Sequence, residues 1–193
     1  MMKQAEEMHC NVGFLDPQIF SATLVQYKSK DVITAIKRDM NHDYVVGAYN
    51  IGSHWVLVII AMKWNVVWYL DSAKSFPLRK FKDVVTIVNW AYSKHMETKM
   101  KKNSKTKPKL THKTDIMCAQ QPSGSLSCGF YVALNMYDLL GDINVIKKAS
   151  DYKATQEVDQ GALRMVQRML YDFILKEIID PKGSFHDEPA HAA

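Results

Sequence analysis

Two apolar runs with only three residues between them set the strongest constraint on how this chain folds. Residues 55–62 are continuously apolar and rich in β-branched side chains, and Val66–Leu70 is a second run of the same kind. Such runs are typical of strands that are buried on both faces of a sheet. Three intervening residues are too few for a crossover, so we expect an antiparallel hairpin. A strand over residues 44–49, ended by a turn at 50–53, should precede it.

The predicted hairpin carries an ionisable residue at each of its open ends. His54 immediately precedes the first apolar run, and Asp71 immediately follows the second. If the turn is centred between Met62 and Lys63, then His54 and Asp71 face each other directly across the two strands. A longer turn would shift this register but would leave both side chains at the same edge of the sheet. The sequence therefore predicts a pair in which the carboxylate orients the imidazole.

Helical patterns are expected on both sides of the hairpin. Residues 78–98 have apolar side chains at helical spacing and should pack on the sheet, and Cys128 opens an apolar stretch that Gly141 should end. A short strand is expected over 115–119. A last helix over 157–179 is expected to bury a stripe of seven side chains: Ala162, Met165, Val166, Met169, Leu170, Phe173 and Ile174.

The segment Gln121-Pro122-Ser123-Gly124-Ser125-Leu126-Ser127-Cys128-Gly129 completes the set of groups that a cysteine hydrolase needs. That chemistry requires a thiolate, an imidazole, a carboxylate and a hydrogen-bond donor for the developing oxyanion. A cysteine at the start of a helix is well placed, because the helix dipole and the free amide groups there favour an anion. The bland alternative is a buried structural thiol at Cys128.

Composition limits the other classes of function. A length of 193 residues with 47% apolar residues suits one domain with a real core, expected over residues 1–180 with a flexible tail at 181–193. No stretch is apolar and long enough for a membrane span or a secretory signal, so we expect a soluble intracellular protein. The three cysteines are odd in number and form no CxxC pair, which argues against a disulfide framework and a zinc site.

The positive charge is concentrated in one segment. The chain has a formal net charge of +5, and residues 94–113 contain eight Lys and one Glu. We interpret this segment as a solvated basic loop, with a nuclear-import signal or a contact with an acidic partner as the alternative. Aromatic residues are not interleaved with the lysines as they are on a nucleic-acid platform.

Three motifs together resemble the ubiquitin-like-protein-specific protease family, which includes the SUMO proteases and, more distantly, adenovirus-type proteases. They are His54-Trp55, Asp71-Ser72, and the Gln-Pro-x-Gly and Cys-Gly-x-Tyr-Val patterns between Gln121 and Val132. The resemblance covers roughly residues 44–180, and residues 179–186 also resemble the divergent plant members associated with transposable elements. It implies an α+β, papain-like fold with a central mixed sheet flanked by helices.

The resemblance also implies a role for each residue of the site. Cys128 would be the nucleophile, His54 the general base and acid, Asp71 the orienting carboxylate and Gln121 the oxyanion donor. Trp55 would cover a narrow channel that admits a Gly-Gly tail. The implied reaction is cleavage after the C-terminal Gly-Gly of a SUMO-like modifier, in a precursor or in a conjugate. The partner is that modifier, and the implied protein is a nuclear or nucleocytoplasmic monomer that needs no cofactor, metal, nucleic acid or membrane.

Two departures from the family pattern leave alternatives open. Gln121 stands seven residues before Cys128, one more than is usual, so Gln120 is a rival for the oxyanion donor. Residues 1–43 lack the helical segment with a further tryptophan and are interpreted as divergent or truncated. The alternative function is a catalytically inactive, transposon-derived module that binds a ubiquitin-like protein. An acetyltransferase that uses the same three groups is a further enzymatic possibility, and Trp55 could be an ordinary core residue.

Overall fold

The computed structural model describes residues 10–73, 81–99, 109–114, 118–141 and 160–186. Contacts divide the chain into two compact units, residues 1–157 and residues 158–193, whereas we expected one domain over 1–180. The sheet and the residues predicted to be catalytic all belong to the first unit. No helix in the described ranges has both the length and the apolar character that crossing a membrane requires.

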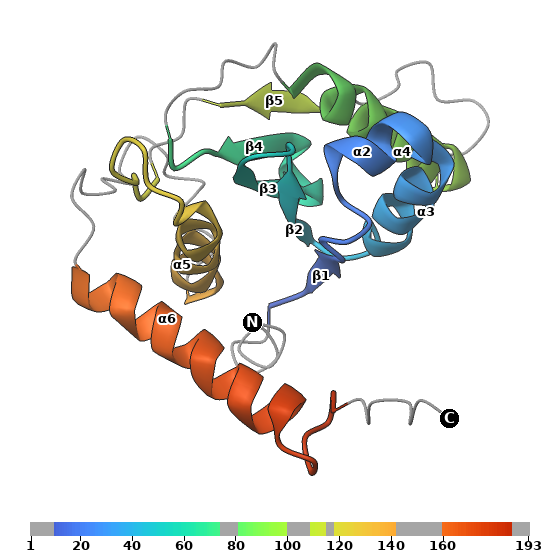
Figure 1. The fold of residues 1–193 in the computed structure, drawn as a ribbon. Coiled ribbons are helices and arrows are strands. Elements are labelled where there is room, and N and C mark those ends of the chain that lie inside the picture. The colour runs from blue at the N-terminus through green and yellow to red at the C-terminus, as the bar shows by residue number, and fades with distance from the viewer. Residues whose placement is uncertain (1–9, 74–80, 100–108, 115–117, 142–159, 187–193) are drawn as a thin grey trace. The chain divides into compact units, whose positions relative to one another are not determined.

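Five strands of the first unit form one mixed sheet in the order β1-β2-β3-β4-β5 (Figure 1). The first and last pairs, β1 with β2 and β4 with β5, are parallel, and the two inner pairs are antiparallel. This confirms the predicted α+β class with a central mixed sheet. The strands are β1 (Val12–Leu15), β2 (Tyr44–Asn50), β3 (Trp55–Ala61), β4 (Val66–Leu70) and β5 (Thr111–Lys113).

The predicted hairpin is present as β3 and β4, but its register differs by two residues from the one expected. Leu57 faces Leu70 and Ala61 faces Val66, so His54 and Asp71 are not directly opposite each other. The cause is a longer turn, in which Met62–Trp64 forms a 3₁₀ helix and Asn65 adopts a left-handed conformation with φ of 54°. A shift by an even number of residues keeps every side chain on its original face.

The sheet is covered by helices on both faces, which explains why its central strands are continuously apolar. Helices α2 (Ala22–Tyr27), α3 (Ser29–Asp39) and α4 (Lys82–Lys99) lie on one face, and α5 (Cys128–Gly141) lies on the other (Figure 1). Alternate strand residues supply two cores. Val56, Val58 and Ile60 of β3 belong to the core under α2–α4, and Leu57, Ile59 and Ala61 belong to the core under α5.

The expected basic loop over 94–113 is wrong at both of its ends. Helix α4 continues to Lys99, because the apolar face that it packs against the sheet extends as far as the buried His95. At the other end, Thr111–Lys113 forms β5 and pairs with β4. Residues 100–108 lie outside the described ranges. The strand expected over 115–119 is also misplaced, since Cys118 and Ala119 are not in a strand and 115–117 are not described.

The second unit, as far as it is described, consists of one helix and the turn after it. Helix α6 (Gln160–Phe173) continues into a π-helical segment, Ile174–Ile179, as the apolar periodicity predicted. The predicted buried stripe is wrong for most of its members. Among the described residues of this unit, five of the seven side chains are well exposed: Met165, Met169, Leu170, Phe173 and Ile174.

Part of the expected flexible tail is also ordered. The backbone N–H of Phe185 donates to the carbonyl of Glu177 (2.8 Å), and the ring centroid of Phe185 lies 5.9 Å from that of Phe173. The chain after Pro181 therefore turns back onto the end of its own helix. Residues 187–193 lie outside the described ranges.

Candidate active site

A tight turn places His54 immediately before β3. Gly52 has φ of 103°, a conformation that glycine adopts without strain, and its N–H donates to Asn50 Oδ1 (2.8 Å). The N–H of Ile51 donates to the carbonyl of His54 (3.0 Å) and closes the turn. The imidazole of His54 is buried, with 7% of the residue exposed. The predicted turn over 50–53 thus fixes where this ring enters the fold.

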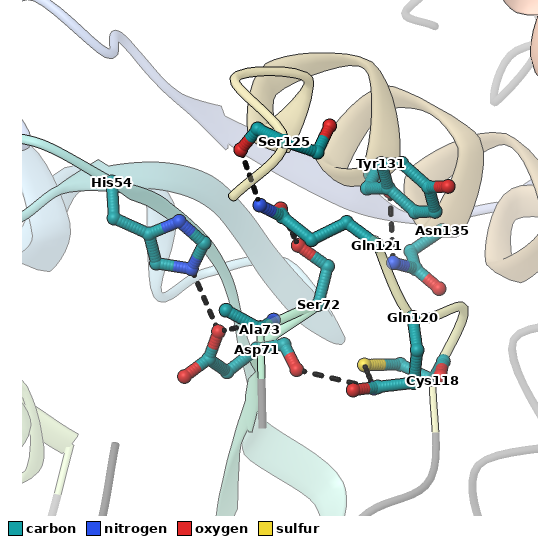
Figure 2. Close-up of polar contacts among 10 residues, drawn as sticks. All are labelled: His54, Asp71, Ser72, Ala73, Cys118, Gln120, Gln121, Ser125, Tyr131 and Asn135. Carbon is teal, nitrogen blue, oxygen red and sulfur yellow. Dashed lines mark hydrogen bonds and ion pairs between the residues drawn. The ribbon is translucent and has the colours of Figure 1, made fainter. Parts of the chain in front are cut away.

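His54 and Asp71, paired in the sequence prediction, are in contact in the structure (Figure 2). His54 Nε2 lies 2.7 Å from Asp71 Oδ1, and the backbone N–H of Ala73 donates to the same oxygen at 2.9 Å. An ionised carboxylate only accepts hydrogen bonds, so Nε2 must carry the hydrogen. In the neutral ring the lone pair then lies on Nδ1, which is the atom that can take up a proton.

The negative charge of Asp71 is poorly compensated apart from the two hydrogen bonds to Oδ1. Its second oxygen, Oδ2, is buried and has no hydrogen-bond partner within the described part of the chain. A buried charge is costly unless an opposite charge or a donor faces it. The hydrogen bonds that Oδ1 accepts from His54 Nε2 and from the N–H of Ala73 are therefore the contacts that stabilise this carboxylate.

Gln121 is hydrogen-bonded to Ser72, the residue that follows Asp71. The backbone N–H of Gln121 donates to the carbonyl of Ser72 (2.9 Å), and the hydroxyl of Ser72 donates to Gln121 Oε1 (2.7 Å). The amide nitrogen of Gln121 donates to the carbonyl of Ser125 (2.9 Å), as Figure 2 shows. The Gln121 side chain therefore spans from the end of β4 to the loop that leads to Cys128.

Gln120, the rival oxyanion donor, has a different set of contacts. Its amide nitrogen donates to the carbonyl of Cys118 (2.9 Å) and to the carbonyl of Asp71 (3.3 Å). These bonds hold the strand end against the segment before the loop. The two neighbouring glutamines thus have separate structural tasks, and the loop that ends at Cys128 is contacted by the side chain of Gln121.

Cys128 is the first residue of helix α5, as the sequence predicted, and it is 9% exposed. The N–H groups of Phe130 and Tyr131 donate to the carbonyl of Ser127, which starts the helix. Helix α5 packs on β3, the strand that His54 precedes. The N-terminus of this helix is a favourable place for an anion such as a thiolate.

Asn135 is a structural residue of this region that the sequence analysis did not single out. It is 1% exposed on α5; its amide nitrogen donates to the carbonyl of Tyr131 (2.8 Å), and its Oδ1 accepts from the N–H of Ala119 (3.1 Å). The second bond ties α5 to the segment that carries both glutamines. A lone amide in an otherwise apolar helix was the available signal, because buried polar groups need partners.

A groove of about 380 Å³ lies beside Trp55, the residue after His54. Trp55 also packs against the core under α5, so its side chain serves both the core and the groove. The groove is lined by Pro17, Gln18, Ser21, Thr23, Asn50, Gly52 and Trp55. Across the described ranges, no three His, Cys, Asp or Glu side chains gather as metal ligands would.

Comparisons with known proteins agree with this architecture. A family model described as the Ulp1 protease family, C-terminal catalytic domain, matches residues 15–143. No curated protein matches the chain. Among solved structures, a SUMO protease Ulp1 with its catalytic cysteine oxidised to a sulfonic acid aligns with a TM-score of 0.57 and 21% identity, over 89% of this chain and 72% of that one.

Two further structures have the same fold. A de-sumoylating protease aligns with a TM-score of 0.58 and 16% identity, over 90% of this chain and 71% of that one. The C-terminal Ulp1 protease domain in complex with Smt3, the yeast ortholog of SUMO, aligns with a TM-score of 0.54 and 20% identity, over 89% and 72%. The family model spans most of the sheet, α5 and the loop before it, so this chain belongs to the Ulp1 protease family of cysteine peptidases.

Proposed function

We propose that this protein cleaves the bond after the C-terminal Gly-Gly of a ubiquitin-like modifier. A SUMO-like modifier is the substrate that we propose. The observation that carries the proposal is the buried contact of 2.7 Å between His54 and Asp71 in a chain of the Ulp1 protease family. Gln121, attached to the same strand end through Ser72, adds a hydrogen-bond donor next to this pair.

In the proposed reaction, His54 takes the proton of the Cys128 thiol, and the sulfur attacks the carbonyl carbon of the last glycine. The carbonyl oxygen becomes an oxyanion and accepts a hydrogen bond from the amide of Gln121. His54 then gives its proton to the leaving amine, and a thioester remains on Cys128. Water attacks this thioester with His54 as the base, which releases the free carboxylate of the modifier and restores the thiol.

The groove beside Trp55 is the proposed site for the modifier tail. Its lining includes Trp55, the residue after His54, and a glycine has no side chain that could clash with the indole. The choice of a SUMO-like modifier is supported by the matched structures, two of which are SUMO-type proteases and one of which is bound to Smt3. The amine that leaves can belong to a precursor peptide or to a lysine in a conjugate.

A panel of fluorogenic substrates made from SUMO, ubiquitin and other ubiquitin-like modifiers tests this proposal. The expected result is release of the fluorophore from a SUMO substrate, with none from the Cys128→Ser variant. A modifier with a C-terminal electrophile should also be captured covalently at Cys128. Binding of a modifier without cleavage or capture would instead favour the inactive binding module, and acyl transfer from acyl-CoA would favour an acetyltransferase.

A further inference from the structure

Ser72 holds Gln121 at two points. Its carbonyl accepts the backbone N–H of Gln121 (2.9 Å), and its hydroxyl donates to Gln121 Oε1 (2.7 Å). Ser72 itself is 2% exposed, so water does not compete for this hydroxyl. In Figure 2 the hydroxyl of Ser72 points toward the Gln121 amide, while the Asp71 carboxylate lies below the ring of His54.

The two ends of the Gln121 amide are distinguished by their partners. The carbonyl of Ser125 can only accept a hydrogen bond, so the amide end that meets it at 2.9 Å must be the NH₂ group. The other end is therefore the oxygen, and the hydroxyl of Ser72 donates to it. A flipped amide would place its oxygen against the carbonyl oxygen of Ser125 and lose the bond there. The second hydrogen of the NH₂ group has no acceptor within the described ranges.

We propose that Ser72 is a positioning residue that fixes the Gln121 amide with its second N–H available to an oxyanion. This inference rests on the proposed function and deepens it, because it assigns a task to a residue outside the set of four reacting groups. The neighbours Asp71 and Ser72 then serve the two halves of the reaction: Asp71 orients the proton carrier His54, and Ser72 orients the donor Gln121. The dipeptide Asp71-Ser72 at the end of β4 thus orients both His54 and Gln121.

The energetic consequence follows from the bonds that remain when the hydroxyl is removed. In Ser72→Ala the amide keeps its bond to Ser125 but loses the donor to its oxygen, so it can rotate about that single contact. Loss of an entire oxyanion donor costs about 10²–10³ in kcat. A donor that is present but poorly oriented should cost less, and we expect a fall of about 10-fold in kcat with little change in KM.

A double-mutant cycle tests the assignment, with the modifier substrate that the wild type cleaves. Ser72→Ala, Gln121→Ala and the double variant are compared, and Ser123→Ala, an exposed serine in the same loop, is the matched control. We expect the double variant to equal Gln121→Ala, because Ser72 acts through Gln121. Independent, multiplicative losses would overturn the proposal, as would an unchanged kcat in Ser72→Ala.

Two further measurements separate positioning from general damage. The rate at which iodoacetamide alkylates Cys128 reports the thiolate directly and should be unchanged in Ser72→Ala; a parallel fall would mean that the substitution disturbs the cysteine instead. The side-chain NH₂ signals of Gln121 in a ¹⁵N spectrum, identified by their loss in Gln121→Ala, should shift in Ser72→Ala. If the wild type cleaves no modifier, the proposed function fails. The ¹⁵N spectra still test the contact between Ser72 and Gln121 in that case, because unshifted Gln121 signals in Ser72→Ala would reject it.

Discussion

His54 Nε2 lies 2.7 Å from Asp71 Oδ1 although the register of β3 and β4 does not pair these residues directly. Extending the register past the strand ends places His54 opposite residue 73, so Asp71 is a diagonal neighbour on the same face. Diagonal positions are within reach of side chains as long as histidine and aspartate. Because a carboxylate can only accept hydrogen bonds, the contact also requires the histidine tautomer with its hydrogen on Nε2. This requirement leads to a specific prediction for Asp71.

Asp71→Asn should lower kcat substantially without unfolding the protein. The asparagine NH₂ can donate to Nε2, which would place the ring hydrogen on Nδ1 and remove the base that Cys128 needs. In another fold the equivalent wrong tautomer costs about 10⁴-fold in kcat. Steady-state kinetics with the modifier substrate measures the loss, and a thermal melt checks the fold. Wild-type activity in Asp71→Asn would remove Asp71 from the catalytic set.

Cys128→Ala should abolish turnover, and His54→Ala should match it, because the two groups act as a unit. The double variant should be no slower than either single one. Cys10→Ala is the matched control, since Cys10 is another cysteine of the described part of the chain and its thiol contacts the carbonyl of Leu140. Residual turnover in Cys128→Ala, measured against an enzyme-free blank, would assign the nucleophile elsewhere.

The sequence was sufficient for those parts of the fold that apolar patterning controls. The hairpin and the helix that starts at Cys128 were predicted because both cores require apolar side chains at definite positions along these segments. The mixed sheet, in contrast, was implied by the family resemblance. The contact of His54 with Asp71 followed from the hairpin, because parity of register decides which face a side chain occupies.

Other features depend on contacts between distant segments and could not be predicted. The two-residue shift of register comes from the left-handed Asn65, whose side chain accepts a hydrogen bond from the hydroxyl of Tyr92 on α4. Strand β5 is short and polar, and its pairing with β4 makes it a strand. The amphipathic pattern of α6 predicted a helix correctly, but periodicity does not say whether another layer covers its apolar face.

Gln121→Ala should reduce kcat by about 10²–10³ if its amide supplies one oxyanion donor. Gln120→Ala should have a smaller effect on kcat, because the Gln120 amide bonds the carbonyls of Cys118 and Asp71. Its main expected cost is stability, on the order of 1 kcal/mol for the lost hydrogen bonds. Kinetics and urea unfolding of both variants separate the two roles. Equal losses of kcat would mean that Gln120 shares the task assigned to Gln121.

His112 should make the fold less stable in mild acid. Its Nδ1 accepts from the hydroxyl of Tyr69 (2.9 Å), its Nε2 donates to Asn89 Oδ1 (3.1 Å), and burial lowers the pKa of His112 to about 4. An unfolded histidine takes up a proton below a pKa of about 6.5, so the unfolded state binds more protons between these values. The stabilising contribution is therefore present above about pH 6.5 and lost as the pH falls toward about 4.

Replacement of the titrating ring tests this expectation. The free energy of unfolding in urea, measured at several values between pH 7.5 and pH 4, should fall more steeply in the wild type than in His112→Gln, by on the order of 2 kcal/mol across the range. His186→Gln, at a half-buried histidine outside the sheet, is the control and should keep the wild-type slope. An unchanged slope in His112→Gln would assign the acid sensitivity to other groups. Because Tyr69 stands two residues before Asp71 on β4, protonation of His112 should also weaken the strand that presents the carboxylate to His54.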